Sequence, residues 1–241
     1  MSSGNGIHNQ ADPLLYNSRI IKNYIEYCKE VHPEVDINSL LSYADITSYE
    51  LEDQGYWLTQ QQVDRFYEIL SQKTGDLDIS REVGRYAASS KASGPVKQYT
   101  LGFMTPVASY CLVNNLASRL TRGSILKTRK IGPEKVEVTS IPNPGVSEKP
   151  YQCENRMGYL EAISNLFTNK FAKIEHPDCI HRGDDCCRYI ITWEKTPSLI
   201  WKRVRNYSVL AGVLLSFGLF FVLPIMPWIS CILLCALISM G

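Results

Sequence analysis

Apolar residues recur at helical spacing through the first hundred residues of the chain. Over residues 17–31 they fall every three to four positions, which predicts a helix with one buried face. Thr59 and Gln62 have the spacing of a capping box and stand ahead of a second stripe of the same kind. We therefore expect a helical N-terminal region over residues 17–95, preceded by a flexible tail of residues 1–16.

The pattern changes to that of strands further along. Residues 124–131 and 134–141 are rich in β-branched side chains, and the Gly-Pro pair between them predicts the turn of a hairpin. Residues 158–171 again carry an apolar helical stripe, and residues 186–193 have strand composition. The sequence predicts an α+β fold with helices packed on an antiparallel sheet, in a ligand-binding domain of residues 96–195.

The final segment, residues 207–241, contains no charged side chain. A helix needs roughly 20 apolar residues to cross a bilayer, and Pro224 and Pro227 divide this segment, so we expect a transmembrane helical hairpin that is truncated at its end. A basic linker, residues 196–206, precedes it. By the positive-inside rule the linker predicts that the soluble domain faces the cytoplasm.

Charge and motifs exclude several classes of function. The chain has 25 basic and 24 acidic residues, so it lacks the cationic excess that nucleic-acid binding requires, and we expect no nucleic-acid partner. It has neither a glycine-rich nucleotide loop nor a clear acid–base constellation, and we assign no catalytic residue.

Cysteine and histidine are concentrated in one segment, HPDCIHRGDDCC, at residues 176–187. Together with one upstream cysteine, the segment offers four metal ligands in the pattern C-x22-H-x2-C-x7-C, namely Cys153, His176, Cys179 and Cys187. Thiolates and imidazoles suit zinc, and a reducing cytosol disfavours structural disulfides. Because Cys186 and His181 lie in the same segment, redox chemistry and inert packing stay open as alternatives.

The residues from Cys153 to Trp193 resemble the 4-vinyl reductase domain family, part of a ligand-binding fold shared with NO-signalling and Golgi-transport proteins. The resemblance rests on C-x-x-x-G-x-x-x-C at residues 179–187, followed by the apolar strand RYII. In the phenol-sensing bacterial activators of that family, zinc is held by a cysteine, a glutamate and two further cysteines at this spacing. The resemblance therefore implies a structural zinc at the four positions named above, with His176 in place of the carboxylate.

The same resemblance implies a closed hydrophobic pocket for a small molecule beside the metal. Bulky or soft side chains that lie where glycine and proline bend the chain are candidates for its lining, with ordinary core packing as the alternative for each: Trp57, Tyr99, Phe103, Met104 and Tyr110. Haem-binding relatives within the superfamily need an axial histidine on a helix and a Tyr-Ser-Arg signature. Neither is found here, so we do not expect haem unless His32 supplies the axial ligand.

These features predict the sensory part of a bacterial membrane-bound signalling protein that resembles a sensor histidine kinase. The domain would bind a small apolar or aromatic ligand, form a homodimer and pass a signal to an output domain beyond residue 241. Two alternatives stay open. One is an accessory protein of tetrapyrrole reduction, and the other is a thiol or metal redox sensor that uses Cys186 and His181 as resolving partners.

Overall fold

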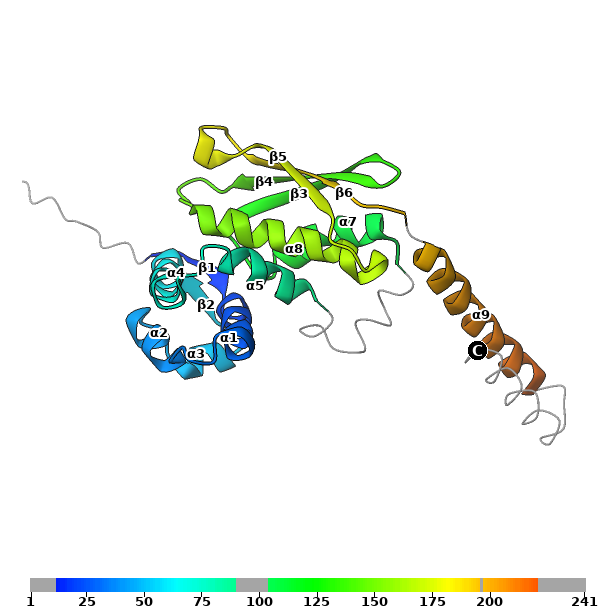
Figure 1. The fold of residues 1–241 in the computed structure, drawn as a ribbon, viewed down its shortest axis with the longest axis horizontal. Coiled ribbons are helices and arrows are strands. Elements are labelled where there is room, and N and C mark those ends of the chain that lie inside the picture. Colours follow the sequence, from blue (N-terminus) through cyan, green and yellow to red (C-terminus); the bar gives the residue numbers. More distant parts are fainter. Residues whose placement is uncertain (1–11, 90–103, 196, 221–241) are drawn as a thin grey trace, which may run out of the picture.

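The computed structural model describes residues 12–89, 104–195 and 197–220, which form two lobes and a long helix (Figure 1). The helical lobe contains β1 (Leu14–Asn17), α1 (Arg19–Val31), α2 (Ile37–Tyr43), α3 (Ser48–Glu52), β2 (Trp57–Thr59) and α4 (Gln60–Thr74). The sheet lobe contains α7 (Pro106–Ala117), β3 (Ser124–Gly132), β4 (Lys135–Pro142), α8 (Pro150–Thr168), β5 (Lys173–Asp178), a short 3₁₀ turn η1 (Ile180–Arg182) and β6 (Cys187–Thr192). Between the lobes lies α5 (Ile79–Ala88), and α9 (Pro197–Phe220) follows the sheet.

Local signals in the sequence explain the helical lobe. The capping box predicted at Thr59 and Gln62 is present at the start of α4, and Gly75 ends that helix with a φ of 65°, which glycine adopts without strain. The buried faces of the helices meet in a core that includes Leu40, Phe66 and Leu70. Each such fully buried side chain stabilises the fold by roughly 1.5–3 kcal/mol relative to an exposed one.

The sheet lobe has the antiparallel strand order β3-β4-β6-β5, and α7 and α8 cover one of its faces (Figure 1). The predicted hairpin is confirmed, since β3 and β4 pair from Ser124↔Pro142 to Gly132↔Lys135. Alternate residues of β4 and β6 point into the core beneath α8, among them Val138, Tyr189 and Ile191. The α+β prediction therefore holds for the described residues.

A close helix crossing joins α5 to α8. Gly84 and Gly158 face the partner backbone so closely that a Cβ atom on Gly158 would lie 1.9 Å from the carbonyl oxygen of Arg81. Beside this crossing, the buried carboxylate of Glu161 pairs with both Arg81 and Arg85, the latter at 2.7 Å. The crossing holds α8, including the first turn of that helix, in a fixed position against the helical lobe.

The last described helix, α9, exposes large apolar side chains on all sides, including Trp201, Leu214 and Phe217. Within the described residues, none of the helices is both long enough and apolar enough to cross a membrane. The predicted transmembrane hairpin is thus not supported for residues 207–220, and its remainder, residues 221–241, lies outside the described residues.

Candidate functional site: a buried thiol cluster at the start of α8

Three of the four predicted metal ligands meet in space. Cys153 lies in the first turn of α8, Cys179 follows β5, and Cys187 begins β6. The Sγ atom of Cys187 lies 3.5 Å from that of Cys153 and 4.0 Å from that of Cys179, and all three sulfurs lie within 4.8 Å of one another. The three residues are at most 5% exposed and none forms a disulfide, so the cluster consists of buried free thiols.

The fourth predicted ligand, His176, lies beside this cluster and is not one of its three converging groups. Its ring stacks on Tyr189 with the ring centres 4.4 Å apart, and its Nε2 atom is buried with no hydrogen-bond partner among the described residues. The His176 side chain also helps to lower the pKa of Cys187. The imidazole is therefore adjacent to the thiols and interacts with Cys187.

The turn that carries Cys179 is held by its own side chains. Asp184 accepts a hydrogen bond from the backbone N–H of Cys179 at 2.7 Å, and Arg182 donates to the carbonyl oxygen of His176 at 2.5 Å. Gly183, with a φ of 97°, allows the chain to reverse between the two. His181 is exposed on this turn and Cys186 is half-buried, and neither of these residues belongs to the group of three converging thiols.

The electrostatics of the cluster favour one thiolate. A hydrogen bond from Cys153 lowers the pKa of Cys187, while the same contact, together with burial, raises the pKa of Cys153. The Arg156 guanidinium, one turn further along α8, favours negative charge at Cys153. A cluster with one proton removed and a cation nearby can bind a metal ion or attack a disulfide, because the thiolate is the reactive form of cysteine.

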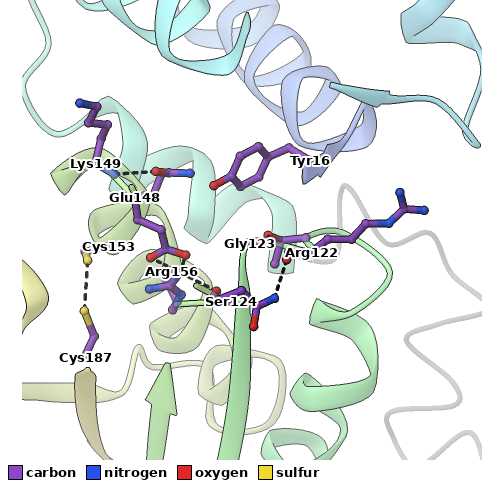
Figure 2. A network of polar contacts seen from close by, with 12 residues as sticks. Tyr16, Arg122, Gly123, Ser124, Glu148, Lys149, Cys153, Arg156 and Cys187 are labelled. Carbon is purple, nitrogen blue, oxygen red and sulfur yellow. Dashed lines mark hydrogen bonds and ion pairs between the residues drawn. The ribbon is translucent and has the colours of Figure 1, made fainter. Parts of the chain in front are cut away.

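Arg156 connects the cluster to the rest of the molecule (Figure 2). Its Nη2 atom lies 2.9 Å from both carboxylate oxygens of Glu148, and its Nη1 atom donates to the Tyr189 hydroxyl at 3.1 Å. The guanidinium also approaches the hydroxyl of Ser124 at 3.5 Å. Burial of both Arg156 and Glu148 makes this pair costly to break, because either partner alone would be an uncompensated buried charge.

The predicted hydrophobic pocket is not assembled by those of its residues that the structure describes. Tyr110 is fully buried in the sheet-lobe core, where its hydroxyl donates to the carbonyl oxygen of Leu160 at 2.8 Å, and Met104 packs against the same core. Trp57 lies in β2 of the helical lobe, beneath the guanidinium of Arg122. Tyr99 and Phe103 lie outside the described residues. The pocket therefore stays a prediction.

A polar cleft that the sequence did not indicate opens between α7 and β3, with a volume of about 450 Å³. Asparagine, serine and threonine side chains dominate its lining, and none of the five predicted pocket residues belongs to it. Residues of this kind are typical of any helix end and turn, so the sequence held no signal that the surface is hollow here.

Solved structures of H-NOX proteins share this fold. An H-NOX protein from S. oneidensis superposes with a TM-score of 0.59 at 14% identity, covering 76% of this chain and 98% of that one. An oxygen-binding H-NOX domain related to soluble guanylate cyclases gives 0.56 at 16% identity, covering 75% and 100%. A third structure, from work on haem redox potential and porphyrin distortion, gives 0.53 at 18% identity, covering 73% and 99%. At such identities the likeness establishes the fold.

These comparisons correct two expectations. No family model and no curated protein matches the sequence. The resemblance to the 4-vinyl reductase family is wrong, because the similar solved structures are H-NOX domains. The cofactor expectation is wrong as well: haem, which we did not expect, is named for the third structure above and for a further H-NOX structure, and zinc is named for none of the three above. A spacing match over about 40 residues did not identify the family.

Proposed function

We propose that the chain is the sensory domain of a signalling protein and binds a small molecule. The observation that carries this proposal is the H-NOX fold, which extends over 76% of the chain and nearly the whole of the S. oneidensis protein. In its finer form the proposal is that the ligand is apolar or aromatic, that two copies associate, and that an output domain attached to this chain receives the signal.

The test is native mass spectrometry of the purified chain, followed by thermal-shift assays with haem, phenols and other tetrapyrroles. We expect one small molecule per chain, or one compound that raises the melting temperature in proportion to its concentration, because a ligand that binds only the folded state stabilises it by mass action. A chain that carries no ligand and responds to none of these compounds would refute the sensory proposal.

Haem is the first cofactor to test, because of the H-NOX neighbours. A histidine that serves as axial ligand must offer a free imidazole nitrogen. Two described histidines, His32 and His176, have a buried Nε2 atom without a hydrogen-bond partner, although Asp76 lies 3.7 Å from that of His32. Neither histidine lines the polar cleft, so the described residues do not place an imidazole in the cleft that they form. Titration with haem, followed by its Soret absorption in wild-type, His32→Ala and His176→Ala chains, will show whether either residue ligates iron.

We also propose that the thiol cluster binds one thiophilic metal ion through Cys153, Cys179 and Cys187, with His176 as the fourth ligand. Three buried sulfurs within 4.8 Å and an adjacent imidazole support this proposal. Co²⁺ is a suitable probe because its thiolate complexes absorb visible light. We expect one Co²⁺ per wild-type chain, loss of binding in Cys187→Ser and retention in Cys186→Ser. Equal binding by both variants, or none by the wild type, would overturn the assignment.

Finally, we propose that α9 holds the chain at a bacterial inner membrane. A helix whose surface is apolar all round favours a lipid or protein environment over water. Flotation with phosphatidylglycerol–phosphatidylethanolamine vesicles tests this proposal. Leu214→Lys should reduce binding, whereas Leu77→Lys, at a residue that is 86% exposed in the helical half of the chain, should not. If neither substitution reduces binding to the vesicles, α9 does not contact the lipid.

A further inference from the structure

The polar cleft lies where the two lobes meet. The end of α7, the turn after it and the start of β3 form its walls, and its polar lining includes Asn114, Ser118, Thr121, Arg122, Ser124 and Asn143. Ile125 and Leu126 add apolar surface. A volume of about 450 Å³ falls within the usual range of small-molecule sites.

Hydrogen bonds within the turn leave both donors and acceptors at the cleft, since the Ser118 hydroxyl donates to the carbonyl oxygen of Asn115. The Thr121 hydroxyl oxygen accepts from the backbone N–H of Gly123 at 3.0 Å, so its own O–H can donate elsewhere. The Asn143 side chain donates to the carbonyl oxygen of Arg122 at 2.7 Å, which fixes one wall. No carboxylate lines the cleft in the described part of the chain.

Among the described residues that line the cleft, Arg122 is the only charged one, and its guanidinium has a fixed position on Trp57, next to the lining. The Arg122 guanidinium lies 3.8 Å from the centre of the Trp57 ring, and this stacking orients it while its N–H edges remain free to donate. A stacked guanidinium is well suited to pair with a carboxylate or phosphate through two parallel hydrogen bonds.

From this arrangement we propose that the cleft is a binding site for a small organic anion, a hydroxy-carboxylate or a phosphate ester. Arg122 pairs with the acidic group, and the hydroxyl and amide groups of Thr121 and Asn114 bind its polar substituents. Ile125 and Leu126 provide the apolar contact. This site is separate from the thiol cluster and does not depend on the metal proposed there.

The residues that line the cleft contact both lobes, so a bound ligand can affect both. The turn that carries Arg122 is tied to β1 by backbone bonds, from Arg122 N–H to Leu15 at 2.8 Å and from Asn17 N–H to Leu120 at 2.9 Å. On the other side, Ser124 reaches Arg156, which contacts Tyr189 and Glu148. An anion at this turn therefore acts on the lobe junction and on the cation nearest to the thiol cluster.

The test is titration of the purified chain with citrate, glucose 6-phosphate and inorganic phosphate, followed by calorimetry and by backbone amide chemical shifts. We expect saturable shifts at residues 121–124 with citrate or glucose 6-phosphate. Inorganic phosphate alone should bind more weakly, since it lacks the polar substituents. Phosphate binding as tight as that of both organic anions would reduce the site to an adventitious ion only, and no saturable shift with any probe would overturn it.

Two variants with matched controls assign the binding to the cleft. Arg122→Gln should weaken the citrate affinity by at least about tenfold, whereas Arg119→Gln, an exposed arginine outside the lining, should not. Asn114→Asp introduces a negative charge at an exposed helix position without disturbing the Trp57 stack, and should weaken binding more than Gln72→Glu on α4. If the controls weaken binding as much as the cleft variants, the attraction is general and not local, and the proposal fails.

Discussion

The crossing of α5 and α8 gives the most demanding test of the fold. Replacing Gly158 by alanine would place a methyl group 1.9 Å from the carbonyl oxygen of Arg81 and 2.8 Å from its carbonyl carbon. Contacts of Cβ atoms below 3.0 Å essentially do not occur, so α5 would have to retreat by at least about 1 Å. The obstacle is main chain, which cannot rotate away as a flexible side chain can.

Overpacking of this kind destabilises the fold by about 3 kcal/mol at the upper end of the usual range. Alanine has a higher helix propensity than glycine, and this difference stabilises the helix by about 1 kcal/mol. We therefore expect Gly158→Ala to lower the free energy of unfolding by about 2 kcal/mol or more, from a total that is typically 5–15 kcal/mol. Urea denaturation, followed by fluorescence of the buried Trp193, measures this loss. Gly212→Ala on α9, where a Cβ atom would meet nothing within 4 Å, is the matched control. A Gly158→Ala chain as stable as this control would show that the helices do not cross as described.

Three further predictions concern the same scaffold. Glu161→Gln should lower the free energy of unfolding, measured by urea denaturation, by about 2 kcal/mol. This is less than the loss expected on breaking a fully buried ion pair, because both arginine partners are about 30% exposed. Glu154→Gln, at the periphery of the same group, should lower it by under about 0.5 kcal/mol. Tyr110→Phe should cost about 1 kcal/mol through the lost hydrogen bond to Leu160, and a neutral result would contradict that bond. Burial raises the pKa of Tyr16 to about 12 from 10.0, so the contribution of the protonated hydroxyl to stability is complete below pH 10 and is lost as the pH rises towards 12. Tyr16→Phe should therefore reduce the slope of the free energy of unfolding against pH in this alkaline range, and an unchanged slope would refute the prediction.

Local chemistry made much of the fold predictable. The capping box at Thr59 and the Gly-Pro turn between β3 and β4 act over three or four residues, and both elements form where expected. The long helix α8 begins at Pro150, about two turns before the predicted start at residue 158, because proline is favoured at the first position of a helix and the polar first turns hide the apolar stripe. The short strands β1 and β2 were not predicted, since each is defined by its partner strand and not by its own pattern.

The thiol cluster shows where reasoning from spacing succeeds and where it stops. Sequence spacing brought Cys153, Cys179 and Cys187 together correctly, because a helix start, a turn and a strand start converge at one end of the sheet. It could not indicate that the His176 ring would stack on Tyr189, since the two residues lie on different strands and their contact depends on strand pairing. The same spacing suggested a family that the fold comparison does not support, because a ligand pattern over 40 residues can occur in more than one family.

What the sequence could not show is the buried cation beside the cluster. An arginine three positions after Cys153 has the composition of an exposed helical face, and only the tertiary fold places Glu148 against it. Once Arg156 is buried, its positive charge interacts with the Cys153 thiol, the Tyr189 hydroxyl and the Glu148 carboxylate. A change in the charge of Cys153, by metal binding or by oxidation, would therefore change the electrostatic field at Arg156, which also contacts Glu148 and Ser124. The chemistry of the cluster and the geometry of the lobe junction are for this reason linked through a single side chain.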